Sequence, residues 1–124
     1  MSLVTNLSKV IEAEEYLSER FNPKPLLVTD NVKIISGYFH AGQFIPVHSP
    51  QIDLVMLIIK GEGTVIAEDI KEDVKEGSLI IVPRGEKRGI LAKTKMVILH
   101  VVTPLPTAED HKEVMEGLKK GSFD

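Results

Sequence analysis

The sequence predicts an all-β fold, an antiparallel sandwich or barrel with one helix at each end. Between Leu26 and Thr103, short runs of aliphatic and β-branched residues recur about every ten residues, separated by turn residues. No helical pattern interrupts these runs, which argues against a parallel sheet with crossover helices. The chain has 124 residues, of which 43% are hydrophobic, so it is the size of one domain that can bury a core.

A first helix is expected over about residues 7–21. Asn6 or Ser8 can cap its start. The apolar residues that follow, Val10, Ala13, Leu17 and Phe21, fall at helical spacing. The segment "NPKP" then ends the helix, because two prolines cannot lie inside one helix.

Seven or eight strands should form the barrel, which is expected to span about residues 26–106. Each predicted strand is a short apolar run, and glycines and prolines lie between many of them. The expected strands are 26–29, 32–39, 43–47, 54–60, 63–67, 78–83, 89–92 and 96–103.

A second helix is expected over about residues 108–120. Thr107 can cap it, and Asp110 lies three residues further on, in the spacing of a capping box. Val114, Met115 and Leu118 form an apolar stripe, and Gly121 can end the helix.

Composition excludes several functional classes. The net charge is −3 with acidic and basic residues mixed along the chain, so nucleic acid and anionic membranes are not expected partners. The chain contains no cysteine, which rules out disulfides, thiolate nucleophiles and cysteine-based metal sites. The longest apolar run, "LVMLII", is too short to span a membrane, and the N-terminus lacks the pattern of a signal peptide. We therefore expect a cytoplasmic protein.

The strand "DLVMLIIK" is apolar on both faces, because side chains alternate along a strand and all six residues from Leu54 to Ile59 are apolar. One face can line the barrel interior, and the other also requires cover. We expect that a second copy of the chain covers it, forming a homodimer. The alternative is that the terminal helices cover this face without a partner.

Two glycine-rich segments resemble the motifs of the cupin family. Gly42, His48, Pro50, Leu54 and Gly61 have the spacing of the first cupin motif, G-x-x-x-x-x-H-x-H-x-x-x-E-x-x-x-x-x-x-G. The second motif, G-x-x-x-x-x-P-x-G-x-x-H-x-x-x-N, is matched in spacing by Gly77, Pro83, Gly85 and Arg88. The resemblance covers roughly residues 32–106. It implies a cupin-type double-stranded β-helix, the jelly-roll barrel.

The resemblance also implies a divalent transition metal held by three histidines and a glutamate. At those positions this chain has His48, Pro50, Leu54 and Arg88, so one ligand of four remains. Proline and leucine side chains have no lone pair, and a guanidinium repels a cation. We therefore expect no metal cofactor.

Three other side chains are alternative candidates for the missing metal ligands: Asp53, His40 and His100. Asp53 is next to the glutamate position, but a one-residue offset points its side chain to the opposite face of the strand unless a β-bulge intervenes. His40 and His100 lie in apolar β segments, where a hydrogen-bonded core or surface histidine is the favoured interpretation. If both pointed into the barrel beside His48, a three-histidine site could form. His111, on the second helix, is expected to be solvated.

Arg88 changes the expected chemistry of the pocket most. An arginine inside an apolar barrel requires a carboxylate, a bound anion or a route to solvent. With His48, it could hold a small anionic or polar metabolite above a wall that includes Leu54 and Met56. Alternatively, Arg88 extends from the barrel mouth into solvent.

Three functional hypotheses follow. The first is a metal-free cupin that binds a small metabolite. The second is an enzyme, either a metal-dependent dioxygenase or isomerase with rearranged ligands, or a metal-free isomerase or lyase with His48 as acid and base. The third is a structural or partner-binding cupin with a filled barrel, which a cavity below about 300 Å³ would favour.

Overall fold

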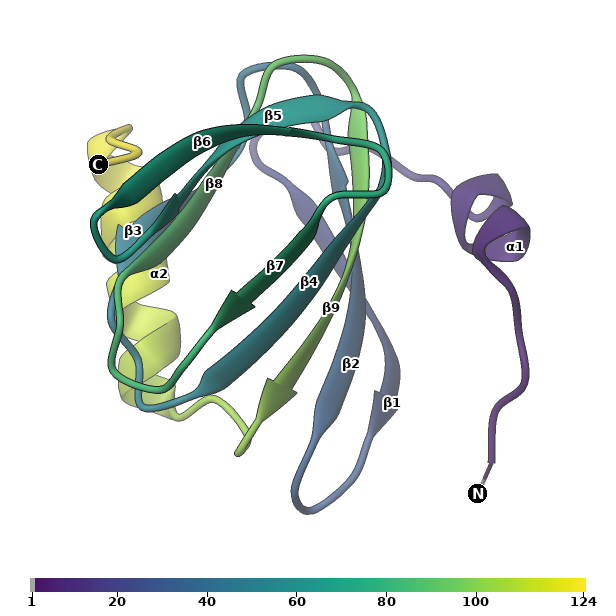
Figure 1. The fold of residues 1–124 in the computed structure, drawn as a ribbon, viewed down its shortest axis with the longest axis horizontal. Coiled ribbons are helices and arrows are strands. Elements are labelled where there is room, and N and C mark those ends of the chain that lie inside the picture. The colour runs from purple at the N-terminus through teal and green to yellow at the C-terminus, as the bar shows by residue number, and fades with distance from the viewer. Residues whose placement is uncertain (1) are drawn as a thin grey trace.

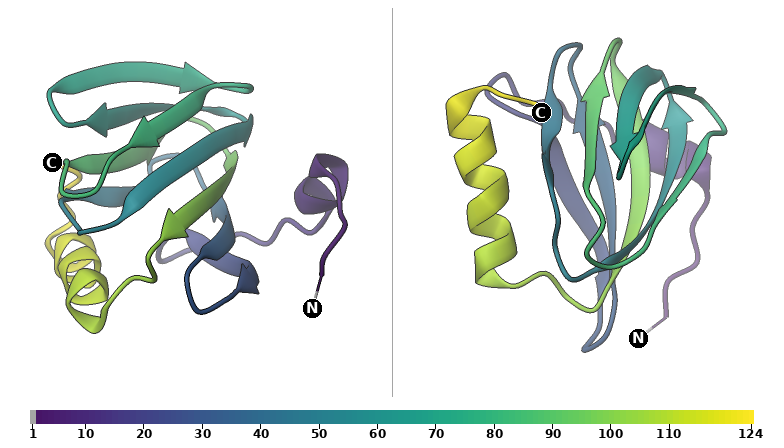
Figure 2. Two further views of the ribbon diagram at one scale, coloured as in Figure 1. Left: turned by 60° about the horizontal axis from the view of Figure 1, so that its bottom comes forward. Right: turned by 60° about the vertical axis from the view of Figure 1, so that its left-hand side comes forward.

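The computed structural model describes residues 2–124 and shows two antiparallel sheets packed face to face, with a helix near each end (Figures 1 and 2). This confirms the predicted all-β fold. In residues 2–124 there are nine strands: β1 (Asn22–Val28), β2 (Lys33–Phe39), β3 (Phe44–His48), β4 (Asp53–Lys60), β5 (Glu62–Ala67), β6 (Ile70–Lys75), β7 (Leu79–Val82), β8 (Arg88–Ala92) and β9 (Met96–Thr103). The helices are α1 (Leu7–Glu12) and α2 (Ala108–Lys120).

The strand order is β1-β2-β9-β4-β7 in one sheet and β3-β8-β5-β6 in the other. Neighbours in both sheets are antiparallel. The inward-facing side chains of the two sheets form one core between them, built around Phe39, Ile58, Ile90 and Ile98, which are fully buried. Two facing sheets with alternating inward residues produce a core of this kind.

Strand β6 was not predicted. Its sequence, "IKEDVK", is mostly charged and only Val74 is buried, so the apolar alternation that identifies a strand is missing. The strand lies at the edge of its sheet, where charged side chains are tolerated and discourage pairing with other chains.

The N-terminal helix is much shorter than predicted, because it ends at Glu12 and not near residue 21. Val10 packs on the outer face of the larger sheet, whereas Phe21 enters the core between the sheets and stacks on Phe39 at 5.2 Å between ring centroids. One straight helix cannot reach both places, so the chain leaves the helix and runs along the barrel (Figure 1).

The barrel also begins earlier than predicted, since β1 starts at Asn22 and contains the "NPKP" segment. Both prolines fit there because β1 is the edge strand of its sheet, where a missing N–H group costs nothing. At the other end, α2 covers the predicted range and has the predicted capping box, with Thr107 as the N-cap and Asp110 at the third position.

The outer face of β4 is only partly covered by the chain itself. Ile59 is buried in a small apolar cluster with Val10 and Tyr38. The Tyr38 hydroxyl donates a hydrogen bond to the Val10 carbonyl at 2.7 Å, which links the first helix to this face of the sheet. Val55, further along the same face, is 42% exposed. No helix in residues 2–124 is long and apolar enough to cross a membrane.

Candidate functional site

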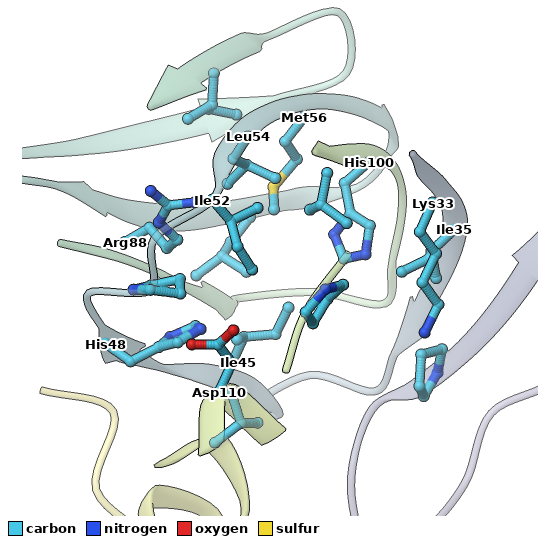
Figure 3. A pocket seen from close by; sticks show the side chains of 18 of the residues that line it. Lys33, Ile35, Ile45, His48, Ile52, Leu54, Met56, Arg88, His100 and Asp110 are labelled. Carbon is cyan, nitrogen blue, oxygen red and sulfur yellow. The ribbon is translucent and has the colours of Figure 1, made fainter. Parts of the chain in front are cut away.

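A cavity of about 190 Å³ opens between the two sheets, next to the N-terminal half of α2 (Figure 3). Most of its wall is aliphatic, and Ile45, Ile52, Leu54 and Met56 are among the residues that line it. Polar groups enter from the two sheets and the helix: Lys33, His48, Arg88, His100, Asp110 and His111. An apolar cavity with a few polar side chains is the usual form of a small-molecule site.

Arg88 and His48 come from neighbouring strands of the smaller sheet, where they are paired in register between β3 and β8. Arg88 is only 5% exposed. Its Nε donates a hydrogen bond to the Glu86 carbonyl at 3.2 Å, and its Nη2 donates to the Pro83 carbonyl at 3.0 Å. These bonds fix the guanidinium against the loop that precedes β8.

No carboxylate in residues 2–124 forms an ion pair with Arg88. Burial lowers the pKa of the guanidinium, and more distant carboxylates, including Asp53 and Asp110, oppose that shift. Arginine remains charged in proteins nonetheless. The structure therefore places an ion that lacks a directly paired counter-charge in the wall of an apolar cavity.

The ring of His48 has a defined orientation. Its Nδ1 lies 2.9 Å from the Pro46 carbonyl, which can only accept, so Nδ1 carries the proton and Nε2 keeps a lone pair when the ring is neutral. Burial lowers the pKa of His48, while the Pro46 bond and the charges of Glu113 and Asp110 oppose the change and Arg88 adds to it. A neutral ring of this kind offers an acceptor, or a base.

His100 lies on β9 in the larger sheet and also lines the cavity. Burial, with a smaller effect of the Lys33 charge, lowers its pKa to about 4. The ring is therefore neutral near pH 7. Figure 3 shows His100 and Lys33 on one side of the cavity, and Arg88 and His48 on the other.

Sequence reasoning missed two charged residues of the cavity. Asp110 was predicted only as part of a helix cap, and its Oδ2 does accept a hydrogen bond from the Thr107 amide at 2.8 Å. The carboxylate of Asp110 also lines the cavity, beside His48 (Figure 3). Lys33 is the first residue of β2 and lies two residues before Ile35, so both side chains point to the same, inner face of the strand. This alternation is present in the sequence and could have predicted the position of Lys33. His111 is exposed, as expected, but contributes to the rim.

The other predicted candidates lie elsewhere. His40 does not line the cavity and packs on Tyr16, with 5.2 Å between the ring centroids. Asp53 is exposed, and its Oδ1 accepts a hydrogen bond from the Arg84 amide at 2.8 Å. Leu54, its neighbour, is buried in the core, which agrees with the expected alternation.

Solved structures with this fold are numerous. An RmlC-like cupin protein from Desulfovibrio desulfuricans is 30% identical to the chain, with a TM-score of 0.69 over 76% of this chain and 92% of that one. The chain belongs to the cupin family.

Two further cupin-fold relatives are more distant. A double-stranded β-helix protein from Klebsiella pneumoniae is 21% identical, with a TM-score of 0.72 over 84% of this chain and 91% of that one. KdgF from a Halomonas species is 16% identical, with a TM-score of 0.67 over 75% and 87%. No protein-family model matches the sequence, and no curated protein does.

The four positions that hold the metal in cupins converge in this chain as the motif spacing implied, because His48, Pro50, Leu54 and Arg88 all line the cavity. Their side chains do not fit a metal, since only His48 can donate a lone pair. Residues 2–124 contain no group of three histidine, aspartate or glutamate side chains placed to hold a metal ion. The three-histidine alternative in particular is not assembled, because His40 is outside the cavity.

Proposed function

We propose that this cupin binds a small anionic or polar metabolite in its barrel without a metal, using Arg88 and His48. The observation that supports this most directly is Arg88, a buried cation in the cavity wall with no ion-pair partner in residues 2–124. A bound carboxylate or phosphate would supply the missing counter-charge, and an arginine side chain has further N–H groups that point in a fixed plane.

The charges around the cavity support an anion. Arg88 and Lys33 contribute two positive charges, and Asp110 contributes one negative charge. His48 Nε2, with its lone pair, suits a hydroxyl next to the acidic group of the ligand.

The cavity volume restricts the ligand to a small molecule. At about 190 Å³ the cavity is below the range of drug-sized sites, which begins at about 300 Å³. An apolar cavity of about 150 Å³ holds benzene, so a ligand of roughly ten non-hydrogen atoms is the upper range. The small volume is also the observation that favours the filled-barrel hypothesis, since Leu54 and Met56 occupy part of the interior.

A thermal-shift assay tests the proposal with short-chain carboxylates and inorganic phosphate as probes. A probe at about 100 times its dissociation constant should stabilise the wild type by roughly 2.7 kcal/mol. The variant Arg88→Met should lose this effect. Arg84→Met is the matched control, because Arg84 is an exposed arginine in the loop that precedes β8. An anion-induced shift that survives in Arg88→Met, or no shift in the wild type, would contradict the proposal.

The orientation of His48 favours a second candidate function, a metal-free isomerase or lyase. With Nδ1 held by the Pro46 carbonyl, Nε2 can take a proton from a bound substrate and return it at another atom. The test is proton–deuterium exchange into the bound acid, followed by NMR. Exchange that requires His48 would support an enzyme, and its absence with a well-bound acid would leave the binding protein.

We also propose a homodimer formed through β7. This edge strand exposes Leu79 (61%) and Ile81 (66%), and these residues pair in register with Leu57 and Val55 of β4 to form one apolar strip. An edge with unpaired backbone groups and apolar side chains is stabilised when a second copy pairs with it about a two-fold axis. Light scattering coupled to size-exclusion chromatography would measure the mass of the species in solution.

A further inference from the structure

His100 is a half-buried residue whose two ring nitrogens are buried in an apolar setting. On β9 it pairs in register with Ile35 of β2 on one side and with Met56 of β4 on the other. These neighbours are 6% and 4% exposed and offer no polar side-chain group. Both ring nitrogens of His100 have almost no accessible surface, and neither has a hydrogen-bond partner in residues 2–124.

Leaving such a group without a partner destabilises a protein, so buried polar groups of this kind are rare. A leucine or methionine at this position would continue the apolar wall. The ring also belongs to the cavity wall, on the side opposite Arg88 and His48, with Ile52, Leu54 and Met56 between the two polar sides (Figure 3). The imidazole is therefore an unpartnered polar group in the wall of the cavity.

We propose that His100 binds a hydroxyl group of the ligand whose acidic group contacts Arg88, so that the ligand is a short hydroxycarboxylic acid with an apolar middle. This inference rests on the proposed function of Arg88. It assigns each part of the ligand to a part of the wall: the carboxylate to the smaller sheet, the hydroxyl to β9 and the carbon chain to the aliphatic residues between them.

A hydroxyl fits His100 better than a second carboxylate does. The ring is neutral, because burial lowers its pKa to about 4, so it offers one N–H donor and one acceptor nitrogen. A hydroxyl can pair with either nitrogen, whereas a carboxylate can only accept and would lose its hydration between Ile35 and Met56. Lys33 is half-buried at the start of β2, and its ammonium is the group that would favour a dicarboxylate instead.

Isothermal titration calorimetry can test this inference with three matched ligand series. The series are ω-hydroxy acids, the corresponding unsubstituted fatty acids and the corresponding dicarboxylates, from about three to six carbons long to suit the small cavity. The protein is tested as wild type, His100→Leu and Arg88→Met. His40→Gln is the control, because it removes a histidine that does not line the cavity.

In the wild type, the best hydroxy acid should bind about tenfold more tightly than its unsubstituted counterpart, as expected for a buried hydrogen-bonding group left unpaired by the wrong ligand. His100→Leu should remove this preference and still bind the fatty acid, whereas His40→Gln should retain it. Arg88→Met should weaken all three series. If His100→Leu does not fold, the imidazole nitrogen resonances of wild-type His100 should shift with the hydroxy acid and not with the fatty acid.

Two results would overturn this inference alone: Arg88-dependent binding of acids with no hydroxyl preference, or tighter binding of the dicarboxylates. Absence of binding in all three series would count against the proposed function of Arg88 and remove the basis for this inference.

Discussion

Acid should destabilise this protein through His100, and the size of the effect follows from its burial. The pKa of His100 in the folded protein is about 4, compared with 6.5 for an exposed histidine. Between these values the unfolded chain binds a proton that the folded protein does not, so the free energy of unfolding falls as the pH is lowered from about 6.5 to about 4. At pH 5 the expected loss is about 2 kcal/mol, and its limit below pH 4 is about 3 kcal/mol.

Urea denaturation of the wild type and of His100→Leu at about pH 7 and about pH 5 measures this loss. The wild type should lose about 2 kcal/mol more than the variant between the two conditions, a large part of the stability of a small domain. His100→Gln, which is polar but does not titrate, should behave like His100→Leu and so separates proton binding from polarity. Equal losses in wild type and both variants would refute the reasoning, because they would mean that the folded protein protonates His100 as readily as the unfolded chain does.

Three further predictions concern the frame and the surface. Gly61 and Gly42 both have φ near +90°, but a Cβ added at Gly61 would collide with the Lys95 carbonyl, whereas one added at Gly42 has no neighbour within contact distance. Gly61→Ala should therefore lower the unfolding midpoint in urea much more than Gly42→Ala does. Without ligand, Arg88→Met should be at least as stable as wild type in the same assay, with a free energy of unfolding up to about 2 kcal/mol higher. The reason is that the substitution removes a buried charge that has no ion-pair partner. A clearly lower free energy of unfolding would mean that Arg88 stabilises the fold. Ile81→Lys should convert the proposed dimer to a monomer in light scattering, and an unchanged mass would exclude β7 as the interface.

Much of the fold follows from local patterns in the sequence. The strands with continuous apolar runs, such as β4 and β9, were predicted within one residue, because a short run of aliphatic residues bounded by turn residues is typical of a buried strand. The second helix was predicted from its caps, since Thr107 and Gly121 define its ends by local hydrogen bonding and backbone conformation.

The elements that were wrong are those set by distant contacts. The first helix ends at Glu12 because Phe21 is drawn into the core beside Phe39, and helical spacing in the sequence carries no information about that contact. Strand β6 exists because its backbone pairs with β5, although its side chains are mostly charged.

The sequence alone determined the frame of the site. The motif spacing predicted that His48, Leu54 and Arg88 lie near one another, and all three line the cavity. The chemistry of their side chains already argued against the metal of other cupins. The sequence could not determine which remaining histidine faces the cavity, because parity is lost across each turn and bulge between strands. The tertiary structure decided that His100 lines the cavity while His40 packs on Tyr16, and that Asp110 and Lys33 add their charges to it. These are contacts between segments that lie far apart in the chain, and they exist only once both sheets and α2 have packed together.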